Sequence, residues 1–547
     1  MDEIAVMRKV WCIAPFLLAL VPGWAVASSK TPADPRAWPT AYEATTMQAT
    51  ELLAAVRKAS GPEDGPTQMR LTYGIRESGM DGTEREVWDG GNYRIDTTVG
   101  PFVTAYGTYD GQRWETNENG YTLLVRGINQ RTEANARALE RTQPSDDVKL
   151  LGRLRQPADV YVLAVAPKDG REERRFYDAT TLRLVRREVH YLDQLVVTTY
   201  DDYRVVKGVA LAYHILVSDG HPANDLVYDV KSFDPAAQVV ASEVEVPGSR
   251  RLPVELPAGA TTVKLPARID ESGHIIVRVT IAGRGLDFQL DSGCAGIVID
   301  RDVARQLKLP MYGGWTTTVA GTFNETRTVI PEAAVGPIVM HDLVADAMPF
   351  QFQNDEATKV VGLLGYDFIA GAVLKINYAD KEVDAIPSDR FTVPARAIAL
   401  DAVLDDEVPM IAMRVNDAIG SRFVLDTGAD LPMVFTGFAH DHPSAVADDS
   451  PNQFVSKAFN FVYAEGVGGL IKAHVTVLAE VQLSNVYFDK TVAMVLAGGQ
   501  AEFEGEDADG LIGATLLTSF DVYLDYMNSR VVLVPNRLTK PRTPAKK

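Results

Sequence analysis

The chain has 547 residues, which at roughly 150 residues per domain predicts several compact units with large cores and excludes a single small module. Apolar residues make up 46% and charged residues 23%, so the composition excludes general disorder and a multi-span membrane protein. Fifty-four Lys and Arg against 73 Asp and Glu leave a net charge of -19, which repels phosphate backbones, and we expect no nucleic-acid partner.

The N-terminus has the features of a secretory signal peptide. The basic pair Arg8-Lys9 precedes the apolar segment Val10 to Leu20, and Ala25-Val26-Ala27 supplies small residues for cleavage. We therefore expect a signal peptide over residues 1–27 and export to the bacterial periplasm or the medium. A retained membrane anchor is the alternative, and Pro15 argues against it because it interrupts the apolar run.

The next segment combines one helix with many short strands. Glu43 to Ala59 predicts an amphipathic helix, because Ala49, Leu52, Leu53 and Val56 fall on one stripe. The β-prone runs that follow have tight-turn Asp-Gly pairs among them, which is typical of an antiparallel meander. These runs are Met69 to Ile75, Tyr93 to Thr98, Val160 to Val165, Leu182 to Val189 and Leu195 to Tyr200.

A long curved sheet that begins with one helix resembles the lipoprotein-carrier fold of the bacterial periplasm. The segments YDGQRW (Tyr109 to Trp114) and YDATTLRLVRREV (Tyr177 to Val189) also resemble that family. The resemblance implies a half-barrel domain over residues 40–241 whose concave face holds acyl chains. A structural or substrate-presenting role is the alternative, since the helix of such a domain can itself fill the curved sheet.

Two segments carry no sustained apolar periodicity. Residues 242–267 contain four prolines and predict a linker. Residues 539–547 form a basic, proline-bearing tail that we expect to be disordered.

The chain repeats itself downstream of the linker. The apolar runs Ile275 to Ile281 and Leu286 to Leu290 are followed by Asp291-Ser292-Gly293, and 135 positions later a second pair of apolar runs is followed by Asp426-Thr427-Gly428. Each copy also closes alike. A Gly-apolar-apolar-Gly segment begins at Gly362 and at Gly510, and each of these glycines stands 16 positions before a tyrosine, Tyr378 and Tyr526.

These paired motifs resemble the pepsin-like and retropepsin-like aspartic proteases, over about half of the chain. The resemblance implies a bilobed β fold made of two retropepsin-like repeats, the first repeat over 268–390 and the second over 391–538. The whole protein is then mainly β: a curved antiparallel sheet with a helix, followed by the two repeats. We expect Asp291 and Asp426 to be the catalytic pair.

Two carboxyl groups are needed because two acids held about 3 Å apart cannot both ionise and so share one proton. One Asp then takes a proton from a water while the other donates a proton to the substrate carbonyl. Glycine after the hydroxyl residue lets the two loops approach without a Cβ clash. The family resemblance assigns the remaining residues to support of the loops. Ser292 and Thr427 hydrogen-bond across the junction with Gly293 and Gly428 beside them, and the segments Leu363, Leu364, Gly365 and Leu511, Ile512, Gly513 pack beneath.

Two further features bear on function. A flap must cover the substrate, and glycines between expected strands make Gly321, Gly466 and Gly468 the flap positions, although ordinary loop tips fit equally well. His440-Asp441-His442 offers metal donors without a third ligand at a recognisable spacing, so we expect a solvated loop, no metal and no cofactor. A short capped helix is expected from Asp300 to Leu307.

We therefore expect an exported aspartic endopeptidase that acts as a monomer on a peptide or protein substrate, with lipid or lipoprotein contact through the N-terminal domain. Three alternatives stay open. In the first, each Asp is an ordinary turn residue after a strand. In the second, the repeats form the fold but serve as a non-catalytic binding or dimerisation module. In the third, the protein binds lipid or polypeptide in the periplasm without cleaving it.

Overall fold

A computed structural model shows a mainly β protein that divides into two compact units. It describes residues 17–19, 36–61, 66–125, 130–140, 142–168, 170–191, 194–249, 254–318, 322–350, 359–405, 407–447, 462–466, 469–496 and 508–539. The first unit holds the described residues of 36–249 together with Tyr312–Thr316, and the second unit holds the others. Within these ranges no helix is long and apolar enough to cross a membrane.

Most of the predicted signal peptide lies outside the described residues, as do its cleavage site and residues 540–547 of the predicted tail. The exception is Leu17–Ala19, which forms the short strand β1 and pairs with β32 (Val462–Gly466) of the second unit. Signal cleavage and export stay predictions.

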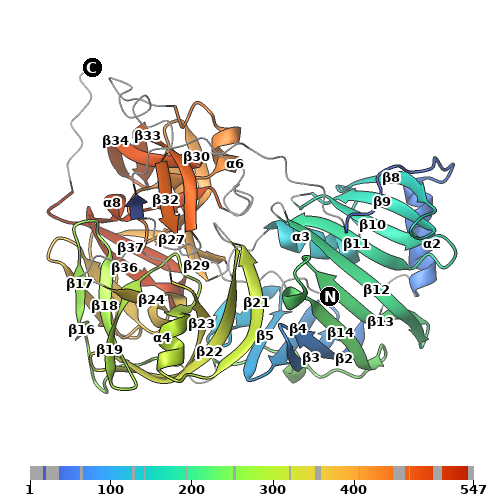
Figure 1. Ribbon diagram of the computed structural model, residues 1–547, viewed down its shortest axis with the longest axis horizontal. Helices are drawn as coiled ribbons and strands as arrows, with labels where there is room; N and C mark the ends of the chain where they lie inside the picture. Colours follow the sequence, from blue (N-terminus) through green and yellow to red (C-terminus); the bar gives the residue numbers. More distant parts are fainter. Residues whose placement is uncertain are drawn as a thin grey trace. The chain divides into compact units, whose positions relative to one another are not determined.

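One antiparallel sheet organises the first unit (Figure 1), which confirms the predicted meander. Over the described residues its thirteen strands run in the order β7-β6-β5-β4-β3-β2-β14-β13-β12-β11-β10-β9-β8. Their bounds are β2 (Gln68–Glu77), β3 (Met80–Asp89), β4 (Asn92–Val99), β5 (Phe102–Tyr109), β6 (Gln112–Thr116), β7 (Thr122–Leu124), β8 (Asp147–Leu154), β9 (Val160–Ala166), β10 (Glu173–Asp178), β11 (Leu184–Tyr191), β12 (Gln194–Val206), β13 (Val209–Ser218) and β14 (Leu226–Asp234). Its helical segments are α2 (Ala49–Ser60), α3 (Gln130–Glu140), η1 (Pro222–Asn224) and η2 (Ala241–Glu243).

The predicted amphipathic helix is α2, although it begins at Ala49 instead of Glu43. The backbone N–H of Gln48 donates to the Glu51 side chain at 2.9 Å, which holds the chain just ahead of the first turn. Leu52 is fully buried against Leu163 and Tyr177 of the sheet, and the rest of the predicted stripe packs beside it. Helix position was therefore set by the apolar stripe, as expected.

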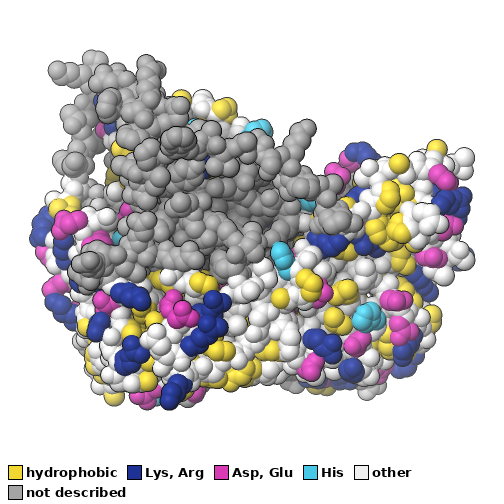
Figure 2. All heavy atoms as spheres, viewed as in Figure 1, with side chains coloured by type: hydrophobic (Ala, Val, Ile, Leu, Met, Phe, Trp, Pro, Cys, Tyr) yellow, Lys and Arg dark blue, Asp and Glu magenta, His cyan; other side chains and the backbone are white. Residues whose placement is uncertain are grey.

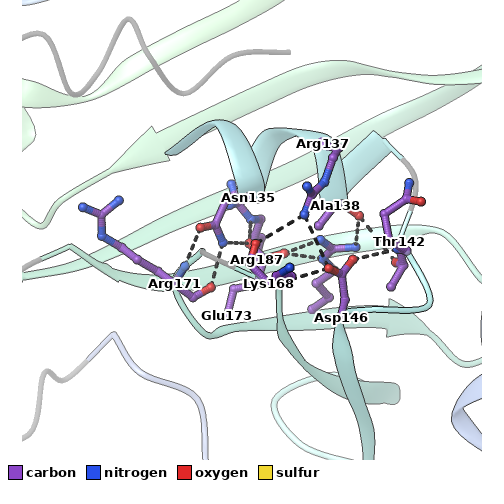
Figure 3. A network of polar contacts seen from close by, with 11 residues as sticks. Asn135, Arg137, Ala138, Thr142, Asp146, Lys168, Arg171, Glu173 and Arg187 are labelled. Carbon is purple, nitrogen blue, oxygen red and sulfur yellow. Dashed lines mark hydrogen bonds and ion pairs between the residues drawn. The ribbon is translucent and has the colours of Figure 1, made fainter. Parts of the chain in front are cut away.

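Helix α3 was not predicted, and it covers a polar part of the sheet (Figure 3). Glu173 is buried between Arg175 and Arg187, with ion-pair contacts to both. The Arg175 guanidinium also donates to the carbonyl of Ala138 on α3 at 3.0 Å, and Asn135 on α3 donates to the carbonyl of Arg171 at 2.8 Å. This portion of the sheet is therefore lined by paired charges and amides.

The second unit contains two sheets with the same strand order, which is the structural form of the sequence repeat. In the first repeat the order β23-β20-β24-β19-β18 matches β34-β31-β35-β30-β29 in the second repeat. In both repeats, the strand that contains the start of the Gly-apolar-apolar-Gly segment (β24, β35) runs parallel to the strand that leads to the Asp motif (β19, β30). Identical pairing directions in both sheets show that the two sequence copies fold alike.

The strands of the first repeat are β17 (Ala267–Ile269), β18 (Ile275–Ile281), β19 (Arg284–Leu290), β20 (Ile297–Asp300), β21 (Met311–Thr318), β22 (Thr322–Val335), β23 (Ile338–Met348), β24 (Val360–Leu364), β25 (Val373–Asn377) and β26 (Glu382–Ile386), with α4 (Arg301–Gln306) and α5 (Tyr366–Ile369). Those of the second repeat are β27 (Ile398–Asp401), β28 (Val403–Asp405), β29 (Val408–Val415), β30 (Ala418–Leu425), β31 (Met433–Val434), β32, β33 (Gly469–Leu483), β34 (Val486–Leu496), β35 (Gly510–Ile512), β36 (Phe520–Asp525) and β37 (Arg530–Pro535), with α6 (Thr436–Asp441), α8 (Ala514–Leu517) and η4 (Tyr526–Asn528).

A third sheet joins the repeats in the order β16-β26-β25-β36-β37-β27. Its centre is the antiparallel pair β25 and β36, one strand from each repeat, whose core residues include Leu374 and Leu524. The predicted linker contributes to this sheet through β16 (Val263–Lys264), which pairs with β26, and to the sheet of the first repeat through β15 (Val254–Glu255), which pairs with β23. The two repeats are thus held together by a continuous backbone ladder.

The expected short helix is α4. The carboxylate of Asp300 accepts the backbone N–H groups of Asp302 at 3.1 Å and Val303 at 2.9 Å, which confirms the predicted cap.

Charges of both signs are interspersed on the face of the protein drawn in Figure 2. The acidic residues behind the net charge of -19 therefore form no single patch on the described part of this face.

Candidate active site

The two Asp motifs lie at the ends of buried parallel strand pairs. Asp291 follows β19 and Asp426 follows β30, and both side chains are fully buried. The backbone N–H of Asp291 donates to the carbonyl of Leu364 at 3.0 Å, and that of Asp426 donates to the carbonyl of Ile512 at 3.0 Å. Each loop is therefore the continuation of a strand ladder, which fixes its backbone.

The expected supporting segments occupy the neighbouring strands. Leu363 and Leu364 of β24 align with the end of β19, and Leu511 and Ile512 of β35 align with the end of β30. All four side chains are buried. The two glycines that follow, Gly365 and Gly513, leave room for the backbones of the Asp motifs, because a methyl group there would lie 2.2 Å and 2.6 Å from a backbone atom.

The two Asp motifs hold each other through a crossed set of hydrogen bonds. The backbone N–H of Ser292 donates to Oγ1 of Thr427 at 3.0 Å, and the backbone N–H of Thr427 donates to Oγ of Ser292 at 2.9 Å. Each hydroxyl then donates to the opposite strand end, Ser292 to the carbonyl of Leu425 at 2.7 Å and Thr427 to that of Leu290 at 3.0 Å. The structure thus brings together residues 135 positions apart, as the repeat predicts.

Glycine is required beside each acid because the opposite carboxyl group lies against it. A methyl group on Gly293 would lie 2.7 Å from Cγ of Asp426, and one on Gly428 would lie 2.8 Å from Cγ of Asp291. Real Cβ contacts this short essentially never occur. Each carboxyl group therefore packs directly against the glycine of the opposite motif.

Burial and mutual repulsion favour a proton on this pair. Burial raises the pKa of Asp291 to about 7, and the hydrogen bond from the N–H of Gly293 opposes only part of the rise. Burial also raises the pKa of Asp426 well above its ordinary value, and the charge of Asp291 raises it further. The negative charge of one acid therefore favours a proton on the other. The pair titrates as a unit that holds one proton between its two apparent pKa values.

Each carboxyl group has one oxygen committed to its own loop. Oδ1 of Asp291 accepts the N–H of Gly293 at 2.8 Å, and Oδ1 of Asp426 accepts the N–H of Gly428 at 2.7 Å. Oδ2 of each acid is buried and receives no hydrogen bond from any other group among the residues that the structure describes. Such oxygens are satisfied by a polar ligand or by water, so this arrangement can hold a water against an acid and a base at once.

Two tyrosines that follow strands of the third sheet lie near the two acids. Tyr526, which follows β36, donates to the carbonyl of Ser292 at 3.4 Å, and its ring stacks on Tyr366 with centroids 5.7 Å apart. Tyr378 occupies the matching position after β25, and burial together with the charge of Asp426 raises its pKa. The repeat marked both tyrosines as equivalent positions, but their place beside the acids could not be deduced from spacing.

Sequence reasoning missed His274 and Asp430. The imidazole Nε2 of His274 lies 2.8 Å from Oδ1 of Asp430, which stands four residues after Asp426. No local signal would have found this contact, because His274 belongs to an ordinary turn and its partner is far away in the sequence.

The flap positions are only partly described. Gly321 and Gly468 lie outside the described residues, in the connections β21–β22 and β32–β33. Gly466 ends β32 and pairs with Gly469 at the start of β33, so a hairpin is present where one was expected. The flap role of all three stays a prediction.

The segment His440-Asp441-His442 differs from the expected loop. His440 and Asp441 end α6, and the exposed His440 lies 3.1 Å from the Asp441 carboxylate. The ring of His442 packs on Phe438 at 4.7 Å. Across the described residues, no group of three or more His, Cys, Asp or Glu side chains has the arrangement of a metal site.

Comparison with known proteins agrees with this geometry over part of the chain. The aspartyl protease family model matches residues 277–368, which run from β18 to α5 and include Asp291. The first repeat therefore contains an aspartyl-protease-like domain. No curated protein matches the chain.

Several solved structures resemble a part of the chain. Basic 7S globulin from soybean is 11% identical, covers 51% of this chain and 97% of its own, and has a TM-score of 0.32. A DUF1329 family protein from Desulfovibrio piger is 12% identical over 36% of this chain and 95% of its own, with a TM-score of 0.29. A LolA superfamily protein from Nitrosomonas europaea is 11% identical over 37% of this chain and 98% of its own, with a TM-score of 0.28.

Proposed function

We propose that the protein is an exported, monomeric aspartic endopeptidase of bilobed, pepsin-like form, in which the two repeats are the lobes and Asp291 and Asp426 are the catalytic residues. The observation that carries the proposal is the pair of buried carboxyl groups, each lying against the glycine of the opposite motif, in two motifs that are joined by crossed hydrogen bonds. Its substrate is a peptide or protein chain, and its place is the periplasm or the medium.

In the proposed mechanism a water binds to Oδ2 of both acids. Asp426 carries the shared proton, because the charge of Asp291 adds to burial in raising its pKa, and Asp291 is the base. As Asp291 takes a proton from the water, the hydroxide attacks the carbonyl carbon and Asp426 protonates the carbonyl oxygen. The resulting tetrahedral diol breaks its C–N bond when Asp291 protonates the amine nitrogen and Asp426 takes a proton from one hydroxyl of the diol. This step releases a carboxylic acid and an amine and returns both acids to their starting state.

The test is cleavage of a peptide library by the mature protein across pH, with and without a transition-state-mimicking inhibitor of aspartic proteases. Asp291→Asn and Asp426→Asn should each reduce cleavage by roughly 10²- to 10⁴-fold, the usual value of general acid–base catalysis. Asp302→Asn is the matched control, because Asp302 is an exposed acid paired with Arg305. Undiminished, inhibitor-insensitive cleavage in both Asn variants would refute the mechanism.

Thermal unfolding distinguishes a variant that has lost catalytic activity from one that has lost its fold. A carboxyl group whose pKa is raised in the folded state stabilises the fold fully at low pH, and this stabilisation is lost as pH rises from the unfolded value of about 4 through the folded value of about 7. Each Asn variant removes one of the two ionisable groups and, with it, the repulsion between two charges. They should therefore be at least as stable as the wild type at neutral pH while they are inactive.

Lipid binding by the first unit is the alternative function, and the charged lining beneath α3 weighs against it. Acyl chains gain free energy by leaving water for apolar surroundings, whereas Glu173, Arg175 and Arg187 fill this region with paired charges. Solvent extraction of the purified protein tests this alternative. Stoichiometric acyl chains, together with no peptidase activity, would favour a binding protein.

A further inference from the structure

His274 lies at the end of a tight turn that precedes β18 in the first repeat. Its backbone N–H donates to Oδ1 of Asp270 at 2.9 Å, and the backbone N–H of Asp270 donates to the carbonyl of His274 at 3.1 Å. The imidazole is almost completely buried, with Nδ1 3.3 Å from Oδ2 of Asp270 and Nε2 2.8 Å from Oδ1 of Asp430. One ring therefore spans two carboxylates that belong to different repeats.

Asp430 is part of the loop that carries Asp426. The backbone of this loop is held by the start of α8, since Ala514 donates to the carbonyl of Ala429 at 2.7 Å and Thr515 donates to that of Asp430 at 3.0 Å. The His274 ring adds a side-chain link between this loop and the first repeat. The same position in the first repeat, four residues after Asp291, is Ala295, so the link exists on one side of the pair only.

The imidazole is cationic at neutral pH. Burial lowers the pKa of His274, but the adjacent carboxylates of Asp270 and Asp430 outweigh burial and raise it to about 9. Three other ionisable side chains lie near the turn. The phenol ring of Tyr378 lies beside Gly273, and Glu271 pairs with Lys381 at 3.0 Å on the exposed side.

We infer that His274 is a positioning residue that holds the Asp426 loop against the first repeat by bridging Asp270 and Asp430. For its effect on catalysis the inference rests on the proposed function. A side chain that fixes one loop relative to the other governs the separation of the two acids, and small misplacements of reacting groups are costly in rate. The bridge therefore acts through Asp426 and does not contact the substrate itself.

The bridge predicts a pH dependence of stability at alkaline pH. A histidine whose pKa rises on folding stabilises the fold fully below its unfolded value near 6.5, and this stabilisation is lost as pH rises through about 9. The melting temperature of the wild type should therefore fall between about pH 7 and pH 10. A variant that has no ionisable side chain at position 274 should lose that part of the fall.

The experiment compares His274→Gln, Asp430→Asn and the double variant with the wild type in kcat, KM and melting temperature from pH 6 to pH 10. Each single variant should lose roughly tenfold in kcat with KM changed less than twofold, because loop geometry changes while substrate contacts stay. The double variant should lose no more than the worse single variant, since both changes break one contact. His440→Gln is the control, because His440 lies beside Asp441 but is exposed.

Two results would overturn the inference: wild-type kcat in His274→Gln, or an unchanged alkaline fall in its melting temperature. Multiplicative losses in the double variant would also count against a shared contact. If the wild type cleaves no peptide, the proposed function fails, while the melting curves still decide whether the bridge exists. The Asp430→Asn variant keeps the test open if His274→Gln does not fold.

Discussion

Adding one methyl group to Gly293 should separate Asp291 from Asp426 while leaving the fold intact. In Gly293→Ala the new Cβ would lie 2.7 Å from Cγ of Asp426 and 2.9 Å from its Oδ2. Ordinary contacts begin at 3.4 Å, so the carboxyl group must retreat by about 0.7 Å, the difference between 3.4 and 2.7. Crowding of this kind costs about 1–3 kcal/mol of stability, which a domain of this size tolerates.

The expected loss of activity follows from the same displacement. A misplacement of about 1 Å can cost roughly a hundredfold in rate, so kcat should fall on the order of 10- to 100-fold. Because the acids interact less when they are farther apart, their two apparent pKa values should also approach each other and narrow the active pH range.

The assay is a pH–rate profile on a cleaved peptide, combined with denaturant unfolding. Gly91→Ala is the matched control, since a methyl group at Gly91 would meet no atom within 4 Å. Wild-type kcat and an unchanged pH range in Gly293→Ala would show that the carboxyl groups do not lie at this separation. Gly428→Ala should reproduce the effect from the other side, because its Cβ would meet Asp291 at 2.8 Å.

Two changes test the interior contacts by denaturant unfolding. Thr427→Val keeps the side-chain shape but leaves the buried N–H of Ser292 without an acceptor, so the free energy of unfolding should fall by about 1–3 kcal/mol. Thr427→Ser keeps the hydroxyl group and should lower this free energy less. Equal losses in the two variants would contradict the role of the hydroxyl group. Glu173→Ala removes the carboxylate that contacts Arg175 and Arg187 and should cost about 3–5 kcal/mol in the first unit. A loss below about 1 kcal/mol would mean that these charges are solvated.

Local patterns predicted much of the fold. Helix α2 follows its apolar stripe, and α4 follows the Asp300 cap, because both signals act within a few residues. Helix α3 (QRTEANARALE) was not predicted, because it covers buried charges and therefore carries no apolar stripe. Runs such as Glu173-Arg174-Arg175 look solvent-exposed in a sequence, and only their pairing inside the first unit buries them.

The sequence alone determined that two similar strand-and-loop units each end in an acid, a hydroxyl and a glycine, because these patterns depend on neighbouring residues. Tertiary structure decided what those acids do to each other. Crossed hydrogen bonds between Ser292 and Thr427, and the ring of His274 against Asp430, join atoms more than a hundred positions apart. The family resemblance led us to expect the first contact, whereas the second leaves no periodicity or spacing, because it depends on how whole sheets pack. That packing also buries both acids, which raises the pKa of each.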